Sequence, residues 1–185
     1  RRFYAPLAIS AERKDGATKI SLISDATVPT EAVWRVRTLD VDGKVLATTE
    51  TPATLAPLSA TAVATLPDAT LFAGGDPART IAVAELLVDG RVTSRVLVSA
   101  APKTMTLPDP GLTATWAGDR LTLTATKLAR AVWLDFGKVE ATPSDNAFDL
   151  LPGESVTVTV ASKTSAAALK RALTIRTLAG QVVPK

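Results

Sequence analysis

The feature that most constrains this chain is a two-residue alternation of apolar and polar side chains, repeated in short runs that end at turn residues. The run AVWRVRTL places Trp34 and Val36 on one face and two arginines on the other, which is the period of a half-buried β-strand. Asp42-Gly43 follows and leads into KVLATTET, so the pattern predicts a β-hairpin here.

Seven such runs lie between Phe3 and Ser99: APLAIS, TKISLIS, AVWRVRTL, KVLATTET, SATAVATL, TIAVAELLV and RVTSRVLVS. Asp89-Gly90 joins the last two as another hairpin. Seven short strands with closely spaced turns and no long helical period are typical of an immunoglobulin-like β-sandwich. Trp34 is then expected to be the buried tryptophan of the third strand.

A cluster of prolines at Pro102, Pro108 and Pro110 interrupts this pattern, since proline resists both helix and central-strand pairing. The alternation restarts beyond it in LTATW, RLTLTAT, AVWLDF, SVTVTVAS and ALTIRTL, and residues 164–171 are expected to form a short helical turn. The sequence therefore predicts an all-β chain of two tandem immunoglobulin-like β-sandwich domains, residues 1–102 and a smaller domain of residues 103–185.

The composition excludes several kinds of active site. The chain has no histidine and no cysteine, which removes the commonest general base, the usual serine-hydrolase triad, thiolate metal sites and disulfides. Its 21 Lys and Arg residues exceed the 18 Asp and Glu residues only slightly and are scattered, so we expect no nucleic-acid partner. No apolar run approaches the roughly 20 residues of a membrane span, and no cofactor is indicated.

The segment SDNAFDLLPGE is the most acidic stretch and the main candidate for a site. Its oxygen-bearing residues are Asp145, Asn146, Asp149 and Glu154, but their spacing does not match a calcium-binding loop with ligands at alternate positions. Paired carboxylates can also hydrolyse glycosides, yet these acids lie beside turn residues or on the polar face of a strand. We therefore expect no catalytic residue, no metal ligand and no cofactor-binding residue in this chain.

A structural reading accounts for more of the same segment. Short polar side chains bond nearby backbone amides, alternation points Phe148 and Leu150 inward, and Pro152-Gly153 fits the centre of a type II turn. The residues expected to build this strand, turn and strand are Asp145, Asn146, Phe148, Asp149, Leu150, Pro152, Gly153 and Glu154.

Trp133 does not fit the core pattern of its own strand. In AVWLDF the side chains of Val132, Leu134 and Phe136 share one face and leave Trp133 on the other. An exposed tryptophan could stack on a sugar ring or fill an interface, whereas a β-bulge could turn it inward. All three readings stay open at this point.

The segment SDNAFDLLPGESVTVTV resembles the signature in the final β-sandwich of family 2 β-mannosidases, with Ala147 where that pattern has an aromatic residue. ARAVWLDF and the opening RRFYAPLAIS are also similar to that family. The resemblance implies the C-terminal immunoglobulin-like domains of an enzyme that removes terminal β-linked mannose. Its two catalytic glutamates would lie on an upstream barrel of the same polypeptide, and we favour a periplasmic or secreted location for that enzyme.

The predicted role is therefore structural, and the fragment alone is not expected to be an enzyme. Two alternatives remain: a carbohydrate-binding module that contacts glycans through exposed aromatic residues, and a scaffold or adhesion protein of the cell surface. Trp133 is the residue that separates the first alternative from the structural role, because it is the candidate for sugar stacking or for an interface.

Overall fold

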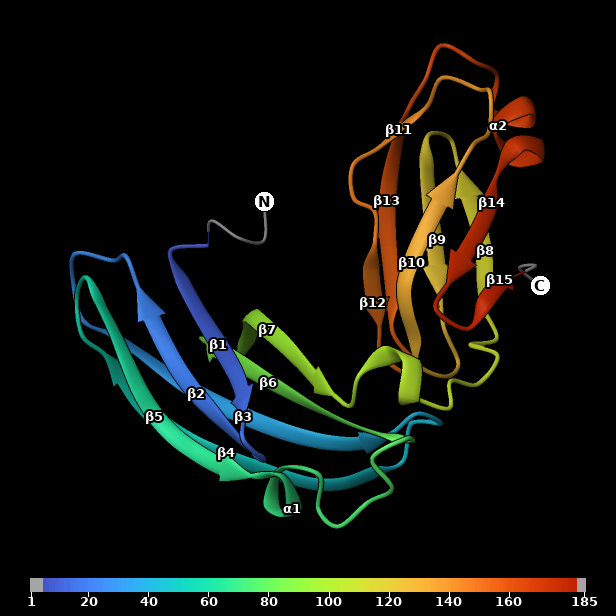
Figure 1. The fold of residues 1–185 in the computed structure, drawn as a ribbon. Coiled ribbons are helices and arrows are strands. Elements are labelled where there is room, and N and C mark those ends of the chain that lie inside the picture. Colours follow the sequence, from blue (N-terminus) through green and yellow to red (C-terminus); the bar gives the residue numbers. More distant parts are fainter. Residues whose placement is uncertain (1–4, 183–185) are drawn as a thin grey trace. The chain divides into compact units, whose positions relative to one another are not determined.

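The computed structural model describes residues 5–182, so residues 1–4 of the RRFYAPLAIS segment lie outside the described residues (Figure 1). The chain divides into two compact units: a first unit of Arg1–Asp40 with Lys44–Met105, and a second unit of Val41–Gly43 with Thr106–Lys185. Both are built from antiparallel sheets, which confirms the all-β fold class. None of the described helices has the length and apolar character needed to cross a membrane.

The described residues of the first unit form seven strands in two sheets, as the seven alternating runs predict. One sheet has the order β1-β2-β5 and the other β4-β3-β6-β7. The strands are β1 (Leu7–Lys14), β2 (Ala17–Ser24), β3 (Thr30–Asp40), β4 (Val45–Leu55), β5 (Ser59–Pro67), β6 (Thr80–Val88) and β7 (Arg91–Ser99). A short helix, α1 (Asp68–Leu71), follows β5, and a single 3-10 turn, η2 (Pro102–Thr104), follows β7.

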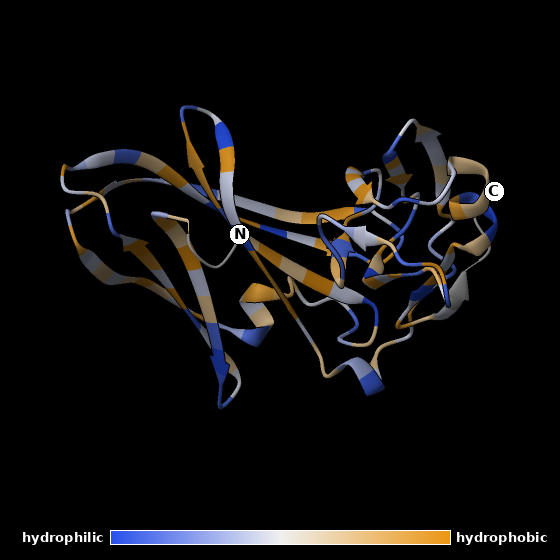
Figure 2. Ribbon diagram, turned by 90° about the horizontal axis from the view of Figure 1, so that it is seen from above, coloured by the Kyte–Doolittle hydropathy of each residue, from blue (hydrophilic) through white to orange (hydrophobic). Residues whose placement is uncertain are grey.

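Alternation decides which side chains of the first unit are buried. Ile20, Leu22 and Ser24 of β2 are buried, and so are Trp34 and Val36 of β3. Hydrophobic and hydrophilic segments accordingly alternate along the strands (Figure 2). The two inward faces meet in one core, which confirms the expected burial of the tryptophan on the third strand.

The two predicted hairpins form with different turns. Asp89-Gly90 has φ values of 50° and 72°, and positive φ at both central residues is what a two-residue type I′ turn requires. The turn at Asp42-Gly43 is longer, because the Asp40 amide donates to the Lys44 carbonyl at 2.9 Å and encloses three residues. Within it Gly43 has a φ of 105°.

The second unit is also a sandwich of two sheets, with strand orders β12-β10-β14-β15 and β11-β13-β9-β8 (Figure 1). Its elements are β8 (Thr113–Ala117), β9 (Arg120–Thr124), β10 (Ala129–Asp135), β11 (Thr142–Pro143), β12 (Phe148–Leu150), β13 (Ser155–Ala161), α2 (Ala166–Ala172), β14 (Thr174–Thr177) and β15 (Gly180–Val182). The predicted helical turn is α2, whose first turn is capped by the Ser165 hydroxyl. Strand β11 was not predicted, because two residues are too short to show a period.

The core of the second unit comes from the inward faces of both sheets. β9 contributes Leu121 and Leu123, and β13 contributes Val158 and Val160, as their alternation predicts. The buried residues that pack together in this core are Leu112, Leu121, Leu123, Ala125, Ala129, Val132, Leu134, Phe136, Phe148, Leu150, Val158, Val160, Leu169 and Ile175. The segment SDNAFDLLPGE therefore runs directly along this core.

Candidate functional site

Asn146 uses its side chain to pair with a distant strand. Its Oδ1 accepts a hydrogen bond from the Leu134 amide at 2.8 Å, and its Nδ2 donates to the Leu134 carbonyl at 3.0 Å. The carboxamide thus presents the same donor and acceptor pair as a backbone peptide. It extends the pairing of β12 along the edge of β10 by one further position. The same Oδ1 also accepts from the Ala147 amide at 3.1 Å, where Ala147 has a φ of 56°.

The side chain of Asp149 bridges a break in the hydrogen-bond ladder between β10 and β12. The register shifts between Ala129 and Val132, and Ala131 within this β-bulge has a φ of 49°. The Ala131 amide donates to Asp149 Oδ1 at 2.7 Å, and Arg130 Nε lies 3.1 Å from Asp149 Oδ2. The carboxylate therefore takes the place of the strand carbonyl that the bulge removes.

The hydrophobic residues of the segment belong to the core, as alternation predicts. Phe148 and Leu150 are buried, whereas Asp149 between them is partly exposed. Phe148 lies opposite Val132, and Leu150 lies opposite Ala129, on either side of the bulge. The aromatic ring is thus placed where the two sheets meet.

The Pro152-Gly153 turn closes the segment. The Glu154 amide donates to the Leu151 carbonyl at 3.0 Å, and Gly153 has the positive φ, 81°, that a type II turn needs at this position. Glu154 Oε2 accepts a hydrogen bond from the Leu151 amide at 3.1 Å, so the carboxylate adds a second hydrogen bond between the two ends of the turn. The Gly153 amide also donates to the Ala125 carbonyl at 2.8 Å, which anchors the turn to the end of β9.

These contacts determine what the acidic segment can do chemically. Asp145 Oδ1 accepts from the Asn146 amide at 3.0 Å, so all three carboxylates of the segment bond backbone amides of their own unit. In the part of the chain that the structure describes, no three acidic side chains are placed to hold a metal ion together. The arrangement stabilises a fold and presents no pair of free carboxylates to a substrate.

Replacing Asn146 with Ala is expected to lower the free energy of unfolding of the second unit by about 2 kcal/mol, because both backbone groups of Leu134 lose their partners. Urea unfolding, followed by hydrogen exchange of amides in β10 and β13, measures this loss. Ser162→Ala is the matched control, since the Ser162 hydroxyl also bonds two backbone groups but lies in the loop between β13 and α2 and pairs with no strand. Equal losses in the two variants would contradict the pairing role of Asn146.

Trp133 is on the outer face of β10 and is 51% exposed. Its neighbours Val132 and Leu134 point into the core, and the bulge at Ala131 does not turn the indole inward. Arg176 of β14 lies directly opposite Trp133 in the antiparallel ladder. Of the three readings of Trp133, the inward-turned one is therefore wrong.

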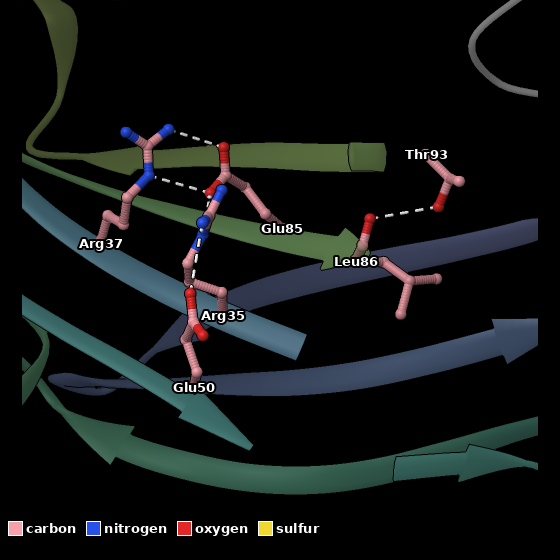
Figure 3. A network of polar contacts seen from close by, with 6 residues as sticks. All are labelled: Arg35, Arg37, Glu50, Glu85, Leu86 and Thr93. Atoms are coloured by element: carbon pink, nitrogen blue, oxygen red, sulfur yellow. Dashed lines mark hydrogen bonds and ion pairs between the residues drawn. The ribbon is translucent and has the colours of Figure 1, made fainter. Parts of the chain in front are cut away.

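A charged cluster on the first unit was not predicted from the sequence (Figure 3). Glu85 of β6 is only 2% exposed, although its neighbours in the strand, Ala84 and Leu86, face the core and Glu85 therefore lies on the opposite face of the sheet. Arg35 and Arg37 of β3 both reach its carboxylate. The sequence predicted that Arg35 and Arg37 share one face of their strand, but it did not show that β6 pairs with this strand and places Glu85 beside them.

The geometry of this cluster is that of a clamped carboxylate (Figure 3). Arg37 binds it with two nitrogens, Nε to Oε2 at 2.9 Å and Nη2 to Oε1 at 2.7 Å, and Arg35 Nε donates to Oε2 at 2.7 Å. Arg35 also donates to Glu50 at 3.2 Å. Burial alone raises the pKa of Glu85, but the hydrogen bonds from Arg37 and Arg35 outweigh it and hold the pKa below its ordinary value.

An irregularity of the ladder lies beside the cluster. The register between β6 and β7 shifts between Leu86 and Leu87, and the Thr93 hydroxyl donates to the Leu86 carbonyl at 3.1 Å across the shift (Figure 3). Thr93 and Asp149 thus perform the same task in the two units, because each side chain satisfies a backbone group at a bulge.

Comparison with known families assigns both units. Residues 16–103 match the model of the mannosidase Ig/CBM-like domain, and residues 107–180 match the Ig-fold domain model named for mannosidases. Residues 16–103 and 107–180 therefore belong to the two immunoglobulin-like domain families of mannosidases. No curated protein sequence matches the chain.

Solved structures share the fold of these mannosidase-type domains. A β-D-mannosidase from Dictyoglomus thermophilum aligns over 95% of this chain and 22% of its own, with a TM-score of 0.73 and 13% identity. The exo-chitosanase CsxA from Amycolatopsis orientalis aligns over 100% of this chain and 27% of its own, with a TM-score of 0.64 and 20% identity. The chain thus spans about a quarter of the length of these proteins.

Proposed function

We propose that this chain is the non-catalytic C-terminal accessory region of an exo-acting family 2 β-mannosidase. An upstream barrel of the same polypeptide would hydrolyse terminal β-linked mannose, and the two immunoglobulin-like units would support its shape and stability. The coarser part of this conclusion, an association with mannosidases, follows from the two family matches.

One observation carries the proposal. SDNAFDLLPGE is the most acidic segment of this chain and the main candidate for a site. Its polar side chains bind backbone groups of the second unit itself. Retaining and inverting glycosidases instead need two carboxyl groups about 5 to 9 Å apart that flank the scissile bond. Acids that already complete a β-ladder and a turn support a structural role.

The first test is an assay of the purified chain with an aryl β-mannoside. No turnover above the uncatalysed rate is expected, because both catalytic glutamates would lie outside this chain. Turnover that copurifies with the folded chain, and that falls in an Asp149→Asn and Glu154→Gln variant of unchanged secondary structure, would contradict the proposal. A contaminating enzyme would be indifferent to these two substitutions.

The second test reads the coding sequence upstream of residue 1. An open reading frame that continues into a (β/α)₈ barrel with two glutamates at the carboxyl ends of its strands is the expected result. An upstream region of adhesion or anchoring domains would instead favour the cell-surface scaffold.

A further inference from the structure

The outer face of the sheet β12-β10-β14-β15 carries an unusual group of side chains around Trp133. We define the Trp133 face as Trp133, Asp135, Arg176, Arg130 and Asp149. Trp133 lies on β10, between β12, which carries Asp149, and β14, which carries Arg176 (Figure 1). Asp135 follows two residues along the same strand and therefore projects on the same side as Trp133.

The indole of Trp133 is open to solvent. Trp133 is 51% exposed, and the guanidinium of Arg176 on the neighbouring strand pairs with a carboxylate, since Arg176 Nη2 lies 3.8 Å from Asp135 Oδ2. Within the described part of the chain, the cation–π contact is that of Arg13 with Phe72, in the first unit. A solvent-exposed tryptophan on an inner strand of a sheet marks a surface suited to contact with an apolar group.

The charges around the indole balance one another. Arg130 Nε lies 3.1 Å from Asp149 Oδ2, and Arg176 pairs with Asp135. Two cations and two anions leave the face without net charge, so it attracts neither polyanions nor polycations. The side chains of Arg176 and Asp135 remain 62% and 38% exposed, and they offer donors and acceptors beside the indole.

A protein partner fits this surface poorly. A stable protein interface covers about 800 Å² on each side and is centred on several large apolar anchors. In the described part of the second unit, the exposed large hydrophobic side chains are Trp133 and Leu178. One aromatic plane within a neutral polar rim instead matches a ligand with one apolar face and a rim of hydroxyls.

We propose that the Trp133 face binds a neutral pyranoside ring of a glycan. The C–H face of the sugar stacks on the indole of Trp133, while Arg176 donates to and Asp135 accepts from its hydroxyls. Asp149 and Arg130 hold the bulge and the strand that carry the tryptophan. The class of ligand follows from the face itself, whereas the choice of mannosides among pyranosides rests on the proposed function.

The test is a titration of the ¹⁵N-labelled chain with manno-, cello- and chito-oligosaccharides, followed by amide chemical shifts and tryptophan fluorescence. Saturable shifts confined to β10 and β14 are expected with manno-oligosaccharides. Trp133→Ala is expected to abolish them, Trp133→Phe to retain weaker binding, and Arg176→Ala to weaken binding about tenfold. Trp116→Phe is the matched control, because Trp116 lies on β8 in the other sheet.

Each outcome decides a different point. Binding of manno-oligosaccharides that depends on Trp133 supports both the face and the proposed function. Binding of cello- or chito-oligosaccharides alone, again dependent on Trp133, supports the face and contradicts the proposed β-mannosidase function. Absence of saturable binding to all three series, or binding that survives Trp133→Ala, overturns the inference and leaves the structural role of the chain untouched.

Discussion

In a Phe148→Ala variant, the free energy of unfolding of the second unit is expected to fall by about 4 kcal/mol. Phe148 is 4% exposed and packs in the core, on the strand that pairs with β10. Its truncation therefore removes buried apolar area and also leaves a cavity. A loss of this size removes a large part of the total free energy of unfolding of a small β-sandwich domain. The variant should therefore unfold near physiological temperature.

Native-state hydrogen exchange of amides in β10, β12 and β13 measures this loss for the second unit by itself. Amides of β3 and β6 report on the first unit in the same experiment. Leu178→Ala is the matched control, because Leu178 is a large hydrophobic residue of the same unit that is 49% exposed. A similar, small loss in both variants would show that the ring of Phe148 is not part of the core.

In a Glu85→Ala variant, the first unit is expected to lose about 3 kcal/mol of unfolding free energy. The substitution leaves the guanidinium groups of Arg35 and Arg37 beside each other without their shared carboxylate (Figure 3). Removing one partner of a buried ion pair costs more than the pair contributes, because the remaining charges stay desolvated. Urea unfolding followed by the fluorescence of Trp34, which is buried in the same unit, measures the change.

Lys19→Ala provides the comparison for an exposed pair, since Lys19 lies 3.3 Å from Glu12 and both side chains are more than half exposed. Its expected effect is within about 1 kcal/mol. If Glu85→Ala is as mild as Lys19→Ala, the cluster of Glu85 and the two arginines does not stabilise the first unit.

The same cluster makes a prediction about pH. Because the pKa of Glu85 is held below its ordinary value, its stabilisation is complete above the unfolded-state pKa of about 4.3 and is lost as pH falls through the folded-state pKa. The stability difference between the natural chain and Glu85→Gln should therefore be constant near neutral pH and shrink in acid. A difference that grows in acid would contradict the sign of the shift.

Local patterns predicted the parts of the fold that depend on neighbouring residues. The side chains of a strand alternate whatever the strand pairs with, so Trp34 and Val36 could be placed on one buried face from β3 alone. Pro152-Gly153 likewise encodes its own turn, because proline fixes one φ and glycine accepts the positive one. The same reasoning placed Phe148 in the core of the second unit.

Contacts between distant strands could not be predicted in this way. A two-residue period shows which face a residue occupies, but it carries no information on which residue of another strand lies opposite. Asn146 was expected to bond its own neighbourhood, and it does bond the Ala147 amide, but its main partner is Leu134 on β10. A β-bulge in this strand was considered only as a way to turn Trp133 inward, and no local pattern indicated the bulge at Ala131 that Asp149 completes.

The sequence by itself determined the class of fold, the two alternating halves and the absence of histidine and cysteine chemistry, because these depend on residue identity and on short-range periodicity. Only the tertiary structure decided that Asn146 and Asp149 bind backbone groups of β10, that Glu85 is clamped by two arginines, and that Trp133 stays exposed. The physical reason is that strand register is set by packing over the whole sheet, and each of these three outcomes depends on register.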